Sequence, residues 1–130
     1  MHRYIFAFLV LLTVSCSKPK VEVISTADFK NTYNQVSTET VLIDVRTEEE
    51  VATGVIEGAV NMNFHDPEFN TQLMALDKNK TYYLYCKSGG RSNRTAELMK
   101  ENGFKEVYDL EGGITAWQAQ GFPVVLPTDK

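Results

Sequence analysis

A cysteine followed by glycines and cations is the part of this chain best suited to chemistry. The segment reads Cys86-Lys87-Ser88-Gly89-Gly90-Arg91-Ser92. Two consecutive glycines allow positive φ and let the backbone close into a tight arc. Successive N–H groups in such an arc, with a helix N-terminus behind them, bind an anion and lower the pKa of a nearby thiol. We therefore expect Cys86 to be a nucleophilic thiolate beside an anion pocket, where Lys87 and Arg91 supply positive charge.

A buried structural cysteine followed by a glycine turn is the alternative interpretation of this segment. The chain has two cysteines, Cys16 and Cys86. If Cys16 is acylated, Cys86 remains as an unpaired thiol in an exported protein, where free thiols are uncommon. The surrounding glycines and cations have no packing role, and this favours the nucleophile.

Length and charge exclude several classes of protein. The chain has 130 residues, with 13 Lys and Arg against 17 Asp and Glu, a formal net charge of −4. That length suits one domain. The acidic balance argues against a nucleic-acid partner. Two cysteines allow neither a disulfide framework nor a structural zinc cluster.

The N-terminal segment is typical of an exported protein. Arg3 precedes an apolar run over residues 5–12, which is too short to span a bilayer but suits a signal peptide. The next residues, 13–16, read Thr-Val-Ser-Cys and resemble a bacterial lipobox, with Thr13 where leucine is usual. The resemblance implies a signal peptide over residues 1–15 and a lipidated Cys16 with its tether over residues 16–20. A plain secretory signal is the alternative. We expect a membrane-anchored lipoprotein facing the periplasm or the cell exterior.

Short apolar strands alternate with helices through the rest of the chain. The pattern predicts strands at residues 21–24, 41–45, 59–62, 81–85 and 107–110, and helices at 26–33, 48 onward, 66–76, 92–102 and 114–120. Thr47 and Glu50 have the spacing of a capping box, and Asp66 before Pro67 is typical of a helix start. We predict a single α/β domain over residues 21–126, followed by a tail at 127–130. Its mostly parallel sheet of about five strands has helices on both faces.

Ligands of such sheets bind beyond the carboxyl ends of the strands. This rule singles out the loop after Tyr85, which is the segment that contains Cys86.

Four motifs, in their order and spacing, resemble the rhodanese (sulfurtransferase) family in its single-domain form. They are Asp-Val-Arg at 44–46, Gly-Val-Ile-Glu-Gly-Ala-Val-Asn at 54–61, the loop at 86–92, and Leu-Glu-Gly-Gly at 110–113 with Ala-Trp at 116–117. The resemblance implies that Cys86 takes the outer sulfur of thiosulfate as a persulfide and passes it to a thiol or to cyanide. It also implies that substrate is bound by the loop, namely Lys87, Ser88, Gly89, Gly90, Arg91 and Ser92. No cofactor and no metal are implied.

Loop length separates this interpretation from related chemistry. Four residues lie between Cys86 and Arg91, whereas related phosphatases have five, so the loop favours sulfur over phosphate. A phosphatase or arsenate reductase of the same fold is therefore a weaker alternative. A persulfide carrier that turns over only with a partner enzyme is another. A thiol oxidoreductase is disfavoured because no second cysteine lies nearby in sequence.

Other polar residues have supporting or structural interpretations. We expect Asp44 and Arg46 to form an ion pair or turn contacts that support the loop. His65 is interpreted as a loop histidine, with a Cys86–His65 dyad as the alternative. Val55 stands where the family usually has histidine, and Lys87 where arginine is common. The acidic run at 48–50 suits the positive end of a helix dipole.

Overall fold

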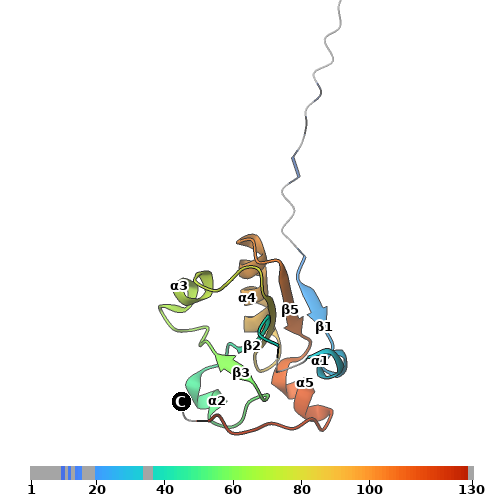
Figure 1. The fold of residues 1–130 in the computed structure, drawn as a ribbon, viewed down its shortest axis with the longest axis vertical. Helices are drawn as coiled ribbons and strands as arrows, with labels where there is room; N and C mark the ends of the chain where they lie inside the picture. Colours follow the sequence, from blue (N-terminus) through green and yellow to red (C-terminus); the bar gives the residue numbers. More distant parts are fainter. Residues whose placement is uncertain (1–9, 11, 13, 16–19, 34–36, 129–130) are drawn as a thin grey trace, which may run out of the picture.

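A five-stranded parallel sheet organises the domain (Figure 1). The computed structural model describes residues 10, 12, 14–15, 20–33 and 37–128. The strand order is β1-β5-β4-β2-β3, which places β4 at the centre and β1 and β3 at the edges. The strands are β1 (Glu22–Ile24), β2 (Thr40–Asp44), β3 (Ala59–Asn61), β4 (Thr81–Tyr85) and β5 (Glu106–Leu110). The helices are α1 (Thr26–Thr32), α2 (Glu48–Val51), α3 (Phe69–Met74), α4 (Gly90–Glu101) and α5 (Gly113–Ala119).

Each face of the sheet has its own apolar core, because successive strand residues point to opposite faces. Ile43 belongs to the core beneath α3 and α4, whereas its neighbour Leu42 belongs to the core beneath α1 and α5. Phe69 and Met99 fill the first core from the helices, and Trp117 contributes to the second. The predicted α/β architecture, with a parallel sheet and helices on both faces, is confirmed.

Capping explains where several helices begin. Ser25 accepts a hydrogen bond from the Asp28 amide at the start of α1. Thr47 and Glu50 form the predicted capping box at α2, where each side chain accepts a hydrogen bond from the other residue's amide.

The predicted helix start at Asp66 is wrong. The carboxylate of Asp66 accepts the Glu68 amide at 2.8 Å, and its carbonyl accepts the Phe69 amide at 3.0 Å. These bonds close a turn around Pro67, so α3 begins at Phe69 without a side-chain cap. The helix predicted from residue 92 begins earlier, at Gly90, because Gly89 takes a φ of 114° and serves as its N-cap.

The predicted signal segment, lipidated Cys16 and tether fall largely on residues 1–9, 11, 13 and 16–19, which lie outside the described residues, as do residues 129–130 of the tail. Within the described residues, no helix has the length and apolar character needed to cross a membrane.

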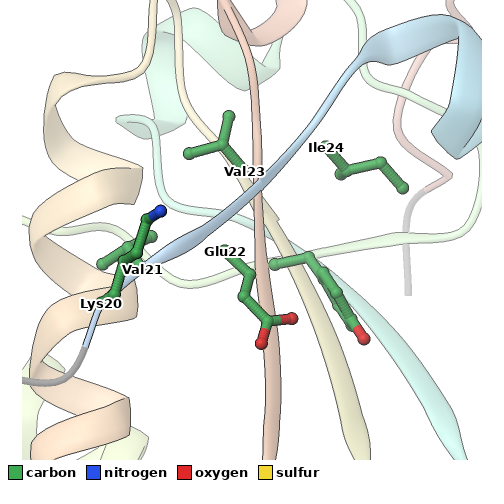
Figure 2. Close-up of a pocket in the computed structure, with 6 residues that line it drawn as sticks. Lys20, Val21, Glu22, Val23 and Ile24 are labelled. Carbon is green, nitrogen blue, oxygen red and sulfur yellow. The ribbon is translucent and has the colours of Figure 1, made fainter.

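The edge strand β1 borders a hollow of about 520 Å³. Figure 2 shows its lining, which comprises Lys20, Val21, Glu22, Val23, Ile24 and Tyr108. None of these residues belongs to the loop at 86–92, so this hollow and the predicted nucleophile are built from different parts of the chain.

Candidate active site

Cys86 follows directly from β4, the central strand, and precedes α4. The Val45 amide donates to the Tyr85 carbonyl at 3.0 Å and holds the end of β4 beside β2. The Cys86 side chain is 1% exposed and lies on the face covered by α3 and α4. The topology therefore places this thiol at the carboxyl end of the sheet, against the first turn of α4.

Hydrogen bonds from the loop converge on the Cys86 sulfur. The Gly89 amide donates to Sγ at 3.1 Å, and the Ser92 hydroxyl donates to it at 3.4 Å. Burial acts to raise the pKa of the Cys86 thiol, but hydrogen bonds from Ser92, Gly89 and Ser88 outweigh it, so the pKa lies below its ordinary value. The N-cap of α4, Gly89, makes no side-chain cap hydrogen bond, and backbone amides at this end of the helix interact with the sulfur instead. The site stabilises a thiolate.

The start of α5 braces the loop from behind. The Ile114 amide donates to the Cys86 carbonyl at 3.0 Å, and the Thr115 amide donates to the Lys87 carbonyl at 3.1 Å. Gly113 makes this approach possible. Its φ is +58°, and a Cβ there would overlap the Cys86 carbonyl and lie 2.7 Å from the Lys87 carbonyl oxygen. Gly113, the first residue of α5, thus has a structural role in shaping the cysteine loop.

Arg91 is held by a carboxylate from α2. Its two terminal nitrogens bind Glu50 at 2.7 and 2.8 Å in a bidentate ion pair. Hydrogen bonds from Arg91 lower the pKa of Glu50 from 4.5 to about 2, against the opposing effect of burial. The charge of Arg91 acts on the Cys86 thiolate, while its planar fork is engaged by Glu50. Sequence reasoning assigned Glu50 to the helix dipole and missed this contact, because the partners are 41 residues apart.

Asp44 and Arg46 form a buried ion pair next to the loop. Their side chains are 0% and 4% exposed, and Arg46 Nη2 lies 2.7 Å from Asp44 Oδ2. Arg46 also donates to the carbonyls of Gly54 and Glu50, at 2.8 and 3.3 Å. Arg46 therefore links the end of β2 to α2, whose Glu50 in turn binds Arg91.

A second hollow, of about 380 Å³, lies where the loop, α2 and α5 meet. Lys87 lines it, and its side chain is exposed. The lining is Arg46, Glu49, Glu50, Thr53, Lys87, Ile114, Thr115 and Gln118. The polar side chains of this set could contact a small molecule approaching the loop.

Of the remaining predicted site residues, one contacts the Cys86 sulfur and the others lie at the surface. Ser92 is fully buried and contacts Sγ, whereas Ser88 and Gly90 are exposed. His65 is also exposed, and its ring packs edge-on against Phe64 at 5.5 Å between centroids. The side-chain hydroxyl that contacts the Cys86 sulfur belongs to Ser92, and no hydrogen bond joins His65 to Cys86 among the described residues.

Comparisons with known proteins agree with this geometry. A family model described as the rhodanese-like domain matches residues 25–120. A putative sulfurtransferase of Bacillus subtilis, YtwF, is 41% identical over 105 residues, covering 80% of this chain and 97% of that protein. A sulfurtransferase of Allochromatium vinosum is 34% identical over 86 residues, covering 66% of this chain and 78% of that protein.

A solved structure shows the same architecture. The crystal structure of a rhodanese-related protein from Thermoplasma volcanium superposes with a TM-score of 0.71 at 29% identity, covering 82% of this chain and 99% of that one. The family match spans every strand except β1 and reaches from the N-cap of α1 to the C-cap of α5. The chain belongs to the rhodanese-like domain family.

Proposed function

We propose that this protein is a sulfurtransferase that moves a sulfane sulfur from thiosulfate, or a similar anionic donor, to a thiophilic acceptor through a persulfide on Cys86. The observation that carries the proposal is the Cys86 sulfur itself, with a lowered pKa and hydrogen bonds from Gly89 and Ser92. The sulfurtransferases among its relatives support the same chemistry.

The first step is a displacement at sulfur. The Cys86 thiolate attacks the outer sulfur of thiosulfate, a new S–S bond forms, and the S–S bond of thiosulfate breaks. Sulfite leaves with the bonding electron pair, so the total charge is unchanged. The terminal sulfur of the persulfide is an anion, and the amides that stabilise the thiolate suit it as well. The proposed step uses Cys86 as a thiolate, the form that hydrogen bonds from the loop favour, and so invokes no general base.

The second step returns the enzyme to its starting state. A thiolate or cyanide attacks the outer sulfur of the persulfide and leaves with it, and the Cys86 thiolate is regenerated. Lys87 is an exposed cation at the edge of the loop and contributes attraction for anions. Arg91 adds charge at longer range, since its fork binds Glu50.

We also propose that the chain is exported and held at a membrane through a lipid on Cys16. The apolar run at 5–12, the small residue Ser15 and the following cysteine support this location. The donor and acceptor would then be met outside the cytoplasm.

Intact mass spectrometry of the purified full chain tests the proposed chemistry. Thiosulfate is added first, cyanide second, and Cys86→Ser is the matched control. We expect a gain of one sulfur atom that is lost to cyanide with release of thiocyanate, and no gain in the variant. Loading without release would instead support a persulfide carrier. The absence of loading from thiosulfate and from other sulfane donors would contradict the proposal.

A further inference from the structure

The second hollow, where the cysteine loop, α2 and α5 meet, adjoins the segment that carries the nucleophile. Its volume is about 380 Å³, within the range of small-molecule pockets. Lys87, which follows Cys86 in the chain, lines it from the loop. Ile114 and Thr115 line it from α5, and their amides donate to the Cys86 and Lys87 carbonyls at 3.0 and 3.1 Å. A molecule in this hollow therefore lies beside the backbone that holds Cys86.

Two of the charges that line the hollow are already balanced by the fold. Arg46 Nη2 lies 2.7 Å from Asp44 Oδ2, and both side chains are buried. Glu50 accepts hydrogen bonds from both terminal nitrogens of Arg91, at 2.7 and 2.8 Å. Each pair holds one positive and one negative group, so neither leaves a net charge for a ligand to complement.

Two further charges of the lining are available to a ligand. Glu49 is exposed on α2, and Lys87 is exposed on the cysteine loop. Neither side chain takes part in a hydrogen bond or an ion pair within residues 20–33 and 37–128. A ligand with only a negative charge would be repelled by Glu49, and one with only a positive charge by Lys87. A molecule that carries both charges is complementary to the hollow.

Neutral hydrogen-bonding groups make up much of the remaining lining. Thr115 and Gln118 expose their side chains from α5. The Thr53 hydroxyl donates to the Glu50 carbonyl at 2.6 Å, and its oxygen can still accept a hydrogen bond. Apart from Ile114, the described residues of the lining are polar or charged. The hollow therefore suits a small polar molecule better than an apolar one.

We propose that this hollow is the acceptor site, and that it selects a low-molecular-weight thiol carrying both an ammonium group and a carboxylate. The ammonium group binds Glu49 and the carboxylate binds Lys87. The thiol is thereby directed to the outer sulfur of the Cys86 persulfide, which lies about 2 Å beyond Sγ. Free L-cysteine has this pattern of groups. The inference rests on the proposed function, because it names the substrate class of the second step.

The transfer to such an acceptor is a displacement at sulfur. The acceptor enters as its thiolate, having lost its proton to solvent, and attacks the outer sulfur of the persulfide. The S–S bond between that sulfur and Cys86 Sγ breaks, and Sγ leaves with the electron pair as a thiolate. The product is the persulfide of the acceptor. Glu49 and Lys87 bind the acceptor and move no proton in this step.

Four thiols separate the contributions of the two charges. They are free L-cysteine, cysteamine, which lacks the carboxylate, 3-mercaptopropionate, which lacks the ammonium group, and 2-mercaptoethanol, which lacks both. The full chain is loaded with thiosulfate and freed of excess donor, and the loss of one sulfur atom is followed by intact mass spectrometry. Rates are expressed per thiolate, after subtraction of the loss without acceptor. Each exposed charge contact should contribute a factor of about two to five, so free L-cysteine should react roughly tenfold faster than 2-mercaptoethanol.

Two substitutions assign these factors to residues. Glu49→Gln should remove the advantage of the ammonium group, so that free L-cysteine reacts no faster than 3-mercaptopropionate. Lys87→Gln should remove the advantage of the carboxylate, so that free L-cysteine reacts no faster than cysteamine. Glu48→Gln is the matched control, because Glu48 is an exposed carboxylate of the same turn of α2 and does not line the hollow. It should preserve the order of the four thiols.

A failure of this inference is distinguishable from a failure of the proposed function. A chain that takes no sulfur from any sulfane donor contradicts both. A chain that loads but releases sulfur to all four thiols at equal rates overturns the acceptor site alone. An order of thiols that persists in both Glu49→Gln and Lys87→Gln, or that is lost equally in Glu48→Gln, also overturns it. Loading with inorganic polysulfide gives the same persulfide, so the comparison of acceptors does not depend on thiosulfate as the donor.

Discussion

At the Cys86 sulfur, burial and hydrogen bonding act in opposite directions on the charge. Desolvation favours the neutral thiol, while Ser92, Gly89 and Ser88 favour the thiolate and prevail. Amides held by a folded loop do not have to reorganise when the charge forms, unlike water. The side-chain cations contribute from further away, since Lys87 is exposed and Arg91 is bound to Glu50.

Cys86→Ser is expected to abolish sulfur transfer while changing the free energy of unfolding by no more than about 1 kcal/mol. The substitution preserves shape and removes the nucleophile. Thiocyanate release and urea denaturation of the same preparations measure the two effects. Wild-type turnover by the serine variant would contradict a persulfide on Cys86.

The ion pair formed by Glu50 and Arg91 should make the free energy of unfolding fall at acid pH. The pKa of Glu50 is lowered from 4.5 to about 2, so its stabilisation is complete above pH 4.5 and disappears as the pH falls to about 2. Glu50→Gln should cost only about 1 to 2 kcal/mol at pH 7, because solvent screens a pair whose side chains are 21% and 28% exposed. The cost should shrink across that acid range in urea denaturation series.

Glu49→Gln is the control for this prediction, since Glu49 is exposed in the same first turn of α2. It should change the free energy of unfolding little, both at pH 7 and in the acid range. An equal loss in both variants would mean that general charge on α2, rather than the bond to Arg91, stabilises the fold.

Among the secondary-structure elements, α5 has the least obvious connection to the chemistry. Its first amides bind the carbonyls of Cys86 and Lys87, and Gly113 permits the close approach. Gly113→Ala should therefore reduce stability by about 1 to 3 kcal/mol beyond the strain of positive φ, and slow sulfur loading by about tenfold or more. Denaturant unfolding and time-resolved mass spectrometry measure these effects.

Gly121→Ala separates backbone strain from steric overlap. Gly121 also has a positive φ, +76°, but a Cβ there would meet no atom within 4 Å. It should lose about 1 kcal/mol and keep its loading rate. If the two alanine variants behave alike, the contact between α5 and the loop has no special role.

Alternation of apolar strands and helices was sufficient to predict most elements. The strand at 81–85 and the capping box at Thr47 depend on local patterns, and both occur as expected. The start of α3 was missed because Asp66 and Pro67 suit a turn as well as a helix N-terminus, and only the tertiary structure distinguishes the two.

The candidate site could be predicted from the sequence only in part, again because local patterns are readable and tertiary contacts are not. Residues 86–92 are consecutive, so their spacing alone predicts an arc around Cys86. Glu50 and Gly113 reach the loop from other elements, which periodicity does not reveal.

On the scale of the whole molecule, the sheet order explains why the reactive loop is well supported. The central strand β4 has β2 and β5 on its two sides, and the loop that follows it is braced by α2 through Arg91 and by α5 through its first amides. Residues distant in sequence therefore converge at one end of a rigid layer.

Cys16→Ser tests the proposed membrane attachment of the whole protein. The variant should lose the mass of the acyl groups and move from the membrane fraction to the soluble fraction after cell lysis. Cys86→Ser should stay with the membranes and is the control. Retention of the Cys16 variant in membranes would argue against a lipid anchor.

The bonds from α5 to the cysteine loop also bear on the order in which the molecule acquires reactivity. Cys86 leaves the ribosome well before residues 113–115, whose amides complete its loop. A growing or unfolded chain therefore carries an ordinary thiol with the reactivity of any exposed cysteine. The activated nucleophile therefore forms late, when the last helix docks, and a chain that has not finished folding is less exposed to oxidation at Cys86.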